Sequence, residues 1–125
     1  MINRSSFDIG KPGSVPFLVN AMFHKVTGRD MDDTSARGMQ GFLALLDAIN
    51  SAGSTEPAKI QAALRAQDLK PEQLMIGYKG VKYDENGQNT LASTLLVQLD
   101  GKKYAAVWPD SSAVQKLALP FKGWG

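Results

Sequence analysis

Apolar residues recur at helical spacing over three stretches in the first half of the chain. Residues 15–27 follow the breaker cluster GKPGS, in which Ser14 is a suitable N-cap, and Gly28 is a natural stop. Residues 34–52 carry the strongest pattern, and a Ser/Thr-rich joint after them leads into a third periodic stretch. The pattern predicts three helices, at about 15–27, 34–52 and 56–67.

The helix predicted at 34–52 has two apolar faces of different character. One face holds Met39, Phe42, Leu43, Leu46 and Ile49, and the other holds Gly38, Gly41, Leu45, Ala48 and Ala52. Two glycines inside a helix cost about 1 kcal/mol each relative to alanine. We therefore expect a close packing partner on the small-residue face, a sandwiched helix, and Arg37, Gln40 and Asp47 on its polar edge.

From Lys79 onward the period of the pattern changes from helical spacing to two. The predicted strands are 79–83, 94–100 and 103–109, followed by an extended tail at 110–125. The turns between them are DENGQN and DGK. The expected fold class is α/β, as a single partial domain over 1–125 in which three helices precede a small strand and hairpin set.

The acidic segment DENGQN admits three interpretations: a metal loop, a catalytic carboxylate pair or a hairpin bend. An EF-hand loop needs glycine at its sixth position and glutamate at its twelfth, whereas here the twelfth residue from Asp84 is Leu95. Adjacent Asp84 and Glu85 in a polar turn would both be ionised, which does not suit acid–base work. Asn86-Gly87 is a strong turn signal, so the segment is interpreted as a bend.

Composition narrows the function classes further. The chain has 125 residues and a net charge of +2, which gives no long-range attraction to nucleic acid or anionic membranes. The absence of cysteine excludes disulfides, thiolate nucleophiles and cysteine-based zinc sites. No stretch reaches the ~20 apolar residues of a membrane span, and the N-terminus lacks the apolar region of a signal peptide. We expect no signal peptide and no anchor in the chain as written.

Candidate catalytic chemistry is sparse. His24 is the single histidine, and no Ser/His/Asp set is identifiable beside it. We therefore expect no enzyme, no catalytic residues, no metal and no cofactor. GKPGS resembles a phosphate loop only superficially, although the helix after it could attract an anion weakly. Tyr104, Trp108 and Trp124 could form a binding platform or, more often for such residues, cross-strand pairs.

Arg37 offers the more specific hypothesis. The segment DDTSAR combines hydroxyls, the free amides of a helix start and a guanidinium, which together suit a ligand carboxylate. The candidate ligand-binding residues are Thr34, Ser35 and Arg37. The alternative is a cap formed by Thr34 or Ser35 with a solvated Arg37, and the residues alone favour this alternative because such caps are common.

Three segments in this order carry a resemblance to a known family. They are the helix ending that runs from Ala48-Ile49 to Leu64, the turn GVKYDENGQN from Gly80 to Asn89, and the strand pair QLDGKKYAAVWP. Residues from about 33 to 109 are similar to the C-terminal part of a periplasmic solute-binding protein of the branched-chain amino acid (leucine/isoleucine/valine) type that serves ABC importers. Each motif is weak alone and specific in combination.

The resemblance implies a type I periplasmic-binding-protein lobe and a paired lobe that closes on a small amino-acid-like ligand or carboxylate. It also implies a periplasmic location, a membrane permease as partner, and no nucleic acid. In such proteins the loop that enters the long helix lines the ligand cleft, which corresponds here to Thr34, Ser35 and Arg37. The family is longer than this chain, so we expect a C-terminal fragment of a non-catalytic substrate-binding component.

The alternative function is a standalone interaction module without ligand binding. A helix with two apolar faces would leave apolar surface exposed in so short a chain, and exposed apolar surface favours self-association. On either hypothesis we expect a homo-oligomer when this chain is expressed alone.

Overall fold

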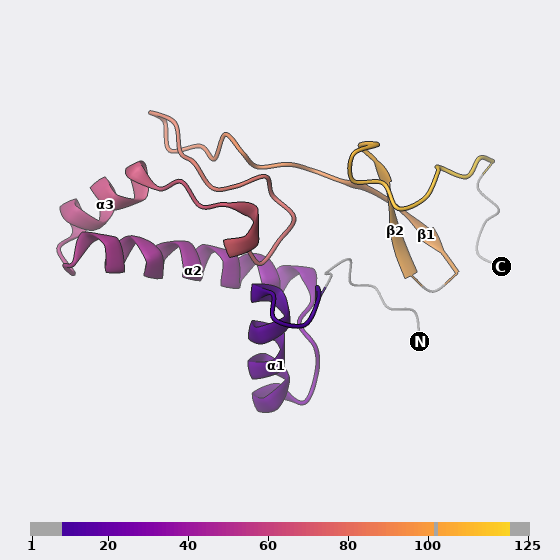
Figure 1. The fold of residues 1–125 in the computed structure, drawn as a ribbon, viewed down its shortest axis with the longest axis horizontal. Helices are drawn as coiled ribbons and strands as arrows, with labels where there is room; N and C mark the ends of the chain where they lie inside the picture. Colours follow the sequence, from indigo (N-terminus) through magenta and orange to yellow (C-terminus); the bar gives the residue numbers. More distant parts are fainter. Residues whose placement is uncertain (1–8, 102, 121–125) are drawn as a thin grey trace. The chain divides into compact units, whose positions relative to one another are not determined.

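The computed structural model describes residues 9–101 and 103–120. Its elements are α1 (Val15–Thr27), α2 (Asp33–Ala52), α3 (Pro57–Ala66), the 3-10 helix η1 (Pro71–Gln73), β1 (Leu96–Asp100) and β2 (Lys103–Trp108) (Figure 1). The predicted order of three helices followed by a small strand set is confirmed, whereas the type I periplasmic-binding-protein lobe stays a prediction. No helix in the described ranges combines the length and the apolar character of a bilayer span.

The chain divides into two compact units. The first comprises Phe7–Ser93 and contains the helices, and the second comprises Thr94–Gly125 together with Met1–Ser6 and contains the strands. The single domain expected over 1–125 stays a prediction, and the units are described in turn.

Local signals set the bounds of α1. The Ser14 hydroxyl accepts a hydrogen bond from the Phe17 N–H at 3.5 Å, which satisfies one of the free donors at the helix start. Gly28 adopts φ 72°, and its N–H donates to the His24 carbonyl at 2.8 Å. Only glycine takes this left-handed conformation without penalty, so the helix ends there.

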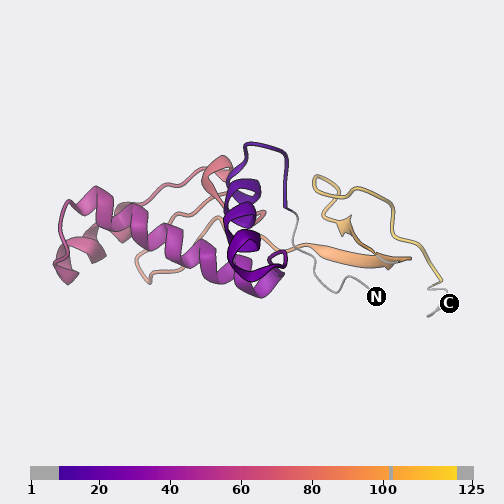
Figure 2. The ribbon, with the colours of Figure 1, turned by 90° about the horizontal axis from the view of Figure 1, so that it is seen from below.

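The apolar side of α1 is largely exposed. Its exposed apolar residues include Leu18, Met22 and Val26. The buried residue of the helix is instead polar: the Asn20 amide donates to the Asp30 carboxylate at 2.9 Å, and its oxygen accepts from the Met31 N–H at 2.8 Å. These bonds fix the link to α2, and α1 lies across the N-terminal part of that helix (Figures 1 and 2).

The buried face of α2 differs from the predicted one. Its buried residues are Ala36, Gln40, Ala44 and Ala48, which repeat every fourth position. Gln40 was expected on a polar edge, whereas Phe42 and Leu46 were expected inside and are 53% and 43% exposed. Alanine side chains let the main chain of residues 67–81 approach closely, and this selects the alanine face for burial.

Two glutamines join α2 to the segment that follows α3. Gln40 accepts a hydrogen bond from the Met75 N–H at 2.7 Å. The Gln67 amide donates to the Ala44 carbonyl at 2.6 Å and to the Asp47 carboxylate at 2.9 Å. Both glutamines are 6% exposed, so these bonds lie in a low-dielectric interior where polar partners are required.

The two glycines on the small-residue face of α2 have no packing partner in the part of the chain that the structure describes, although Ala48 on that face is buried. A Cβ atom at Gly38 or Gly41 would meet no atom of another segment within 4 Å. The expectation of a close partner at these glycines is therefore wrong for the described residues. Leu45, on the same face, is 40% exposed.

The core of the first unit lies between α2 and the chain after α3. It consists of Ala44, Leu69, Leu74 and Val81, with Tyr78 and Tyr83 packed against it. α3 packs beside α2 (Figure 1), but none of its residues is fully buried. The core thus consists mainly of residues from the non-helical segment after α3, which packs against α2.

A strand at 79–83 is absent from the described structure, contrary to the prediction. Val81 forms an isolated bridge with Leu69, and Tyr83 forms another with Asn89. The Asn89 side-chain oxygen accepts from the Lys82 N–H at 3.0 Å, a position that a strand would fill with a main-chain carbonyl. The side chain thereby replaces part of the ladder, and the pairing stays local.

The bend at DENGQN is a turn organised by Asp84. Its carboxylate accepts hydrogen bonds from the N–H groups of Asn86 and Gln88, each at 2.9 Å. Gly87 takes φ 79°, whereas Asn86 does not adopt a positive φ. The turn interpretation is confirmed, and the Asp84 carboxylate stabilises the turn by accepting these main-chain hydrogen bonds.

The second unit is an antiparallel hairpin. Val97 pairs with Ala106 and Leu99 with Tyr104, with a register shift near Leu96. Gly101 turns the chain with φ 61°. In place of the predicted extended tail at 110–125, the chain forms a turn at residues 110–112 and bends at 114–115 and 119–120, and residues 121–125 lie outside the described ones.

The tail is attached to the hairpin by hydrogen bonds. The Gln98 amide donates to the Ala118 carbonyl and its oxygen accepts from the Ala118 N–H, both at 2.9 Å. The Val114 N–H donates to the Ala106 carbonyl, also at 2.9 Å. Among the described residues of this unit no apolar side chain is fully buried, so hydrogen bonds rather than a buried core hold these residues of the tail to the hairpin.

Candidate functional site

The start of α2 contains the three residues predicted to bind a ligand, and Ser35 is already engaged there. The Ser35 N–H donates to the Asp32 carboxylate at 2.8 Å, and its hydroxyl donates to the same oxygen at 2.6 Å. The Asp32 N–H in turn donates to the Ser35 hydroxyl at 3.0 Å. This capping box makes Asp32 the N-cap, in place of the predicted Thr34 or Ser35.

Asp32 also sets the charge at this helix start. Its hydrogen bonds from Ser35, and secondarily the nearby Arg29 at 3.7 Å, lower the pKa of the Asp32 carboxyl below its ordinary value. The carboxylate therefore stays ionised at neutral pH and occupies the positive end of the helix dipole. The main-chain amides here are consequently a poor site for a second anion.

Arg37 and Thr34 remain accessible. The Arg37 guanidinium lies 3.7 Å from the Asp33 carboxylate, and its side chain is 69% exposed. Such an exposed pair contributes little and can exchange partners. Thr34 is exposed as well. The structure thus places Thr34 and Arg37 on open surface at one helix end, with Ser35 as a positioning residue below them.

The capping box makes a testable contribution to acid stability. Because the folded pKa of Asp32 is depressed, its stabilisation is present above the unfolded pKa of about 4 and is lost as the pH falls through the lower folded pKa. We expect the stability of Asp32→Asn to fall less than that of the native chain between pH 5 and pH 2, because asparagine keeps a capping oxygen without a titrating charge. Thermal unfolding across that range measures it, with exposed Asp110→Asn as the control. Equal acid slopes for Asp32→Asn and the native chain would contradict this role.

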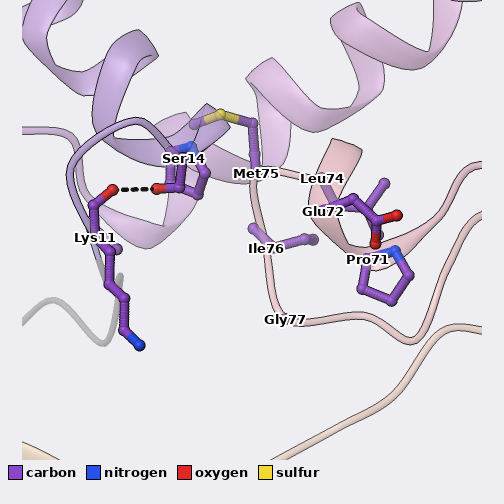
Figure 3. A pocket seen from close by; sticks show the side chains of 10 residues that line it. Lys11, Ser14, Pro71, Glu72, Leu74, Met75, Ile76 and Gly77 are labelled. Carbon is purple, nitrogen blue, oxygen red and sulfur yellow. Dashed lines mark hydrogen bonds between the residues drawn. The ribbon is translucent and has the colours of Figure 1, made fainter.

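A pocket of about 330 Å³ lies elsewhere in the first unit, beside the start of α1 (Figure 3). It is lined by Gly10, Lys11, Ser14, Pro16, Pro71, Glu72, Leu74, Met75, Ile76 and Gly77. The loop before α1 forms one side, and η1 with the chain after it forms the other. The sequence of GKPGS predicts only a helix start and gives no indication of the pocket. Residues 71–77 carry no periodicity, so nothing in the sequence predicts that they face GKPGS.

The structure adds no support for a functional role of the remaining candidate residues, the histidine and the aromatic side chains. His24 is exposed on α1. Tyr104 and Trp108 are 37% and 52% exposed on the hairpin, and Trp124 lies outside the described residues. In the described part of the chain, no group of three or more His, Asp or Glu side chains is arranged to hold a metal ion.

Comparison with known proteins supplies the strongest functional signal. No family model matches the chain. Leu/Ile/Val-binding protein homolog 7 of Brucella abortus (strain 2308) is 34% identical over 80 residues, which cover 64% of this chain and 20% of that protein. Leu/Ile/Val-binding protein homolog 8 of Brucella suis biovar 1 (strain 1330) is 31% identical over 106 residues, or 85% of this chain and 26% of that protein.

The predicted resemblance is confirmed by these relatives. The chain is homologous to a segment of proteins named for binding leucine, isoleucine and valine, and it spans about a fifth to a quarter of their length. That the matched segment is the C-terminal one stays a prediction.

Proposed function

We propose that this chain is part of the substrate-binding component of an ABC importer for branched-chain or related amino acids. The observation that carries the proposal is the similarity over 106 residues to a Leu/Ile/Val-binding protein homolog. Those relatives are named as binding proteins, which supports a non-catalytic role. A periplasmic location and a membrane permease as partner belong to the same proposal.

At residue level, we propose that Arg37 pairs with the carboxylate of the amino acid and that Thr34 donates a hydrogen bond beside it. Arg37 has the exposure and the weak present partner that such an exchange requires. Ser35 contributes by holding the helix start through Asp32. Because this site is open, we expect weak binding by the present chain, with a dissociation constant on the order of millimolar.

The test is a titration of the full 125-residue chain with L-leucine, followed by amide NMR shifts. We expect progressive shifts at the start of α2, and a loss of affinity of about tenfold in Arg37→Ala, the size of a lost charge-assisted hydrogen bond. Arg65→Ala is the matched control, because Arg65 lies on α3 and donates to the Glu85 carbonyl. Unchanged affinity in Arg37→Ala would remove Arg37 from the site, and no α2 shifts with leucine, isoleucine or valine would contradict the proposed binding.

A further inference from the structure

The turn organised by Asp84 presents the pair Asn86-Gly87 to solvent. Both residues are exposed. Asn86 takes part in the turn through its main-chain N–H, and within the described ranges its side-chain carboxamide has no hydrogen-bond partner. A Cβ atom at Gly87 would meet no atom within 4 Å beyond its chain neighbours, so no other segment crowds the peptide group between the two residues. The carboxamide is therefore free to move against the main chain that follows it.

An asparagine carboxamide in this setting faces an internal nucleophile. The main-chain nitrogen of the next residue lies close enough along the chain to attack the side-chain carbonyl carbon, provided that the backbone can turn towards it. Glycine is the most favourable next residue, because it has no Cβ to hinder the approach and its backbone adopts the widest range of conformations. The exposed pair Asn86-Gly87 meets both conditions.

The other asparagines of the chain are protected where the structure describes them. Asn20 is 6% exposed and is bonded through both ends of its amide. The side chain of Asn89 bonds to three main-chain groups of nearby residues. Asn50 lies inside α2, where main-chain N–H groups are bonded to the preceding turn. Each of the three is followed by a residue with a side chain, and Asn3 lies outside the described residues.

One hydrogen bond in the turn opposes attack at Asn86. The Gly87 N–H donates to the Asp84 carbonyl at 3.0 Å, and this bond must open before the nitrogen can react. The bond lies in an exposed turn, where water replaces the lost partner. Its opening therefore slows the reaction by no more than about tenfold, the factor that corresponds to one such hydrogen bond.

We propose that Asn86 is a site of spontaneous deamidation in the folded chain. The Gly87 main-chain nitrogen forms a bond to the Asn86 Cγ atom, the bond from Cγ to the amide nitrogen breaks, and ammonia leaves with the proton that Gly87 gives up. Water then adds to the resulting succinimide ring. Opening at the side-chain carbonyl leaves aspartate, and opening at the main-chain carbonyl leaves isoaspartate.

The isoaspartate product is incompatible with the present turn. It inserts a methylene group into the main chain after residue 86, whereas the Asp84 carboxylate now accepts from the N–H groups of both Asn86 and Gln88, at 2.9 Å each. It also adds a carboxylate beside those of Asp84 and Glu85, which repel it. Arg65 on α3 donates to the Glu85 carbonyl at 3.2 Å, so opening of the turn releases this link to α3 as well.

The experiment incubates the full 125-residue chain at mildly alkaline pH and follows the exchange of amide for acid by mass spectrometry of tryptic peptides. We expect residue 86 to react about tenfold or more faster than residues 20, 50 and 89, in native buffer. Asn86→Gln is the matched control, because it keeps an exposed amide whose longer side chain would have to close a larger ring. It should abolish the reaction at residue 86 and leave the other sites unchanged.

Amide NMR of the reacted chain tests the effect on the turn. We expect the isoaspartate form to lose the hydrogen-bonded shift of the Gln88 amide, and Asn86→Asp, which adds the charge without the methylene group, to keep it. Equal rates at residues 86 and 89 would overturn the proposal. So would a rate at residue 86 that is about a hundredfold lower in native buffer than in urea, because the folded turn would then protect the site.

Discussion

Leu74→Ala will lower the free energy of unfolding of the first unit by about 2–4 kcal/mol. Leu74 is 2% exposed and belongs to the core that joins α2 to the non-helical chain, together with Ala44, Leu69 and Val81. Truncation removes buried methyl groups and leaves a cavity, and both losses destabilise the folded state. The effect is large because this core has few other large side chains to close around the gap.

Urea unfolding followed by circular dichroism at 222 nm measures the loss. Leu18→Ala is the matched control, because Leu18 is 53% exposed on α1, and its truncation should change stability by no more than about 0.5 kcal/mol. A similar loss in both variants would show that residue 74 is not a core position.

Gly80→Ala will destabilise the same unit by about 2–3 kcal/mol. A Cβ atom at Gly80 would lie 2.8 Å from the Leu69 carbonyl oxygen and 2.7 Å from the Leu91 side chain. That carbonyl accepts the Val81 N–H at 3.0 Å, so relieving the clash would strain the bridge between Leu69 and Val81. Gly80 also has φ 158°, which side chains rarely adopt.

The comparison for this variant is Gly77→Ala, three residues earlier on the same segment. Its added methyl group would have open space, so we expect a change of no more than about 0.5 kcal/mol. Equal stability of Gly80→Ala and the native chain in urea unfolding would be incompatible with the close approach at Leu69.

Sequence reasoning succeeded where the signal was local. Ser14 and Gly28 border α1 by satisfying donors and by tolerating φ 72°, effects that need no distant partner. The turn at Asn86-Gly87 is likewise determined by adjacent residues. Helix caps and turns depend on a few neighbouring dihedral angles, so their sequence patterns are informative.

The burial of α2 could not be predicted in the same way. Periodicity ranked the large apolar side chains of Phe42 and Leu46 above Gln40, but the outcome was decided by the main chain of Met75, 35 residues away along the sequence. The alanine face of α2 is the buried one because its small side chains let the main chain around Met75 approach closely. No local pattern reports such a partner.

At the candidate site, too, local features could be predicted from the sequence and tertiary ones could not. The capping role of Asp32 could have been considered, since Asp is a favoured N-cap residue, although the reciprocal partner three positions later is usually Glu or Gln and is Ser35 here. It was missed because the helix was expected to begin at residue 34, which moved the cap onto Thr34 or Ser35. The pocket, by contrast, joins residues 10–16 to residues 71–77 and depends wholly on tertiary structure.

The division into two units gives each of them its own optical signature. Both tryptophans, Trp108 and Trp124, belong to the unit that contains the strands, whereas every described helix belongs to the other. Indole emission excited at long wavelength thus reports on the hairpin unit, while helical ellipticity reports on the remainder. Coincident midpoints from the two signals would mean that the units unfold as one cooperative block, and separated midpoints would assign each its own stability.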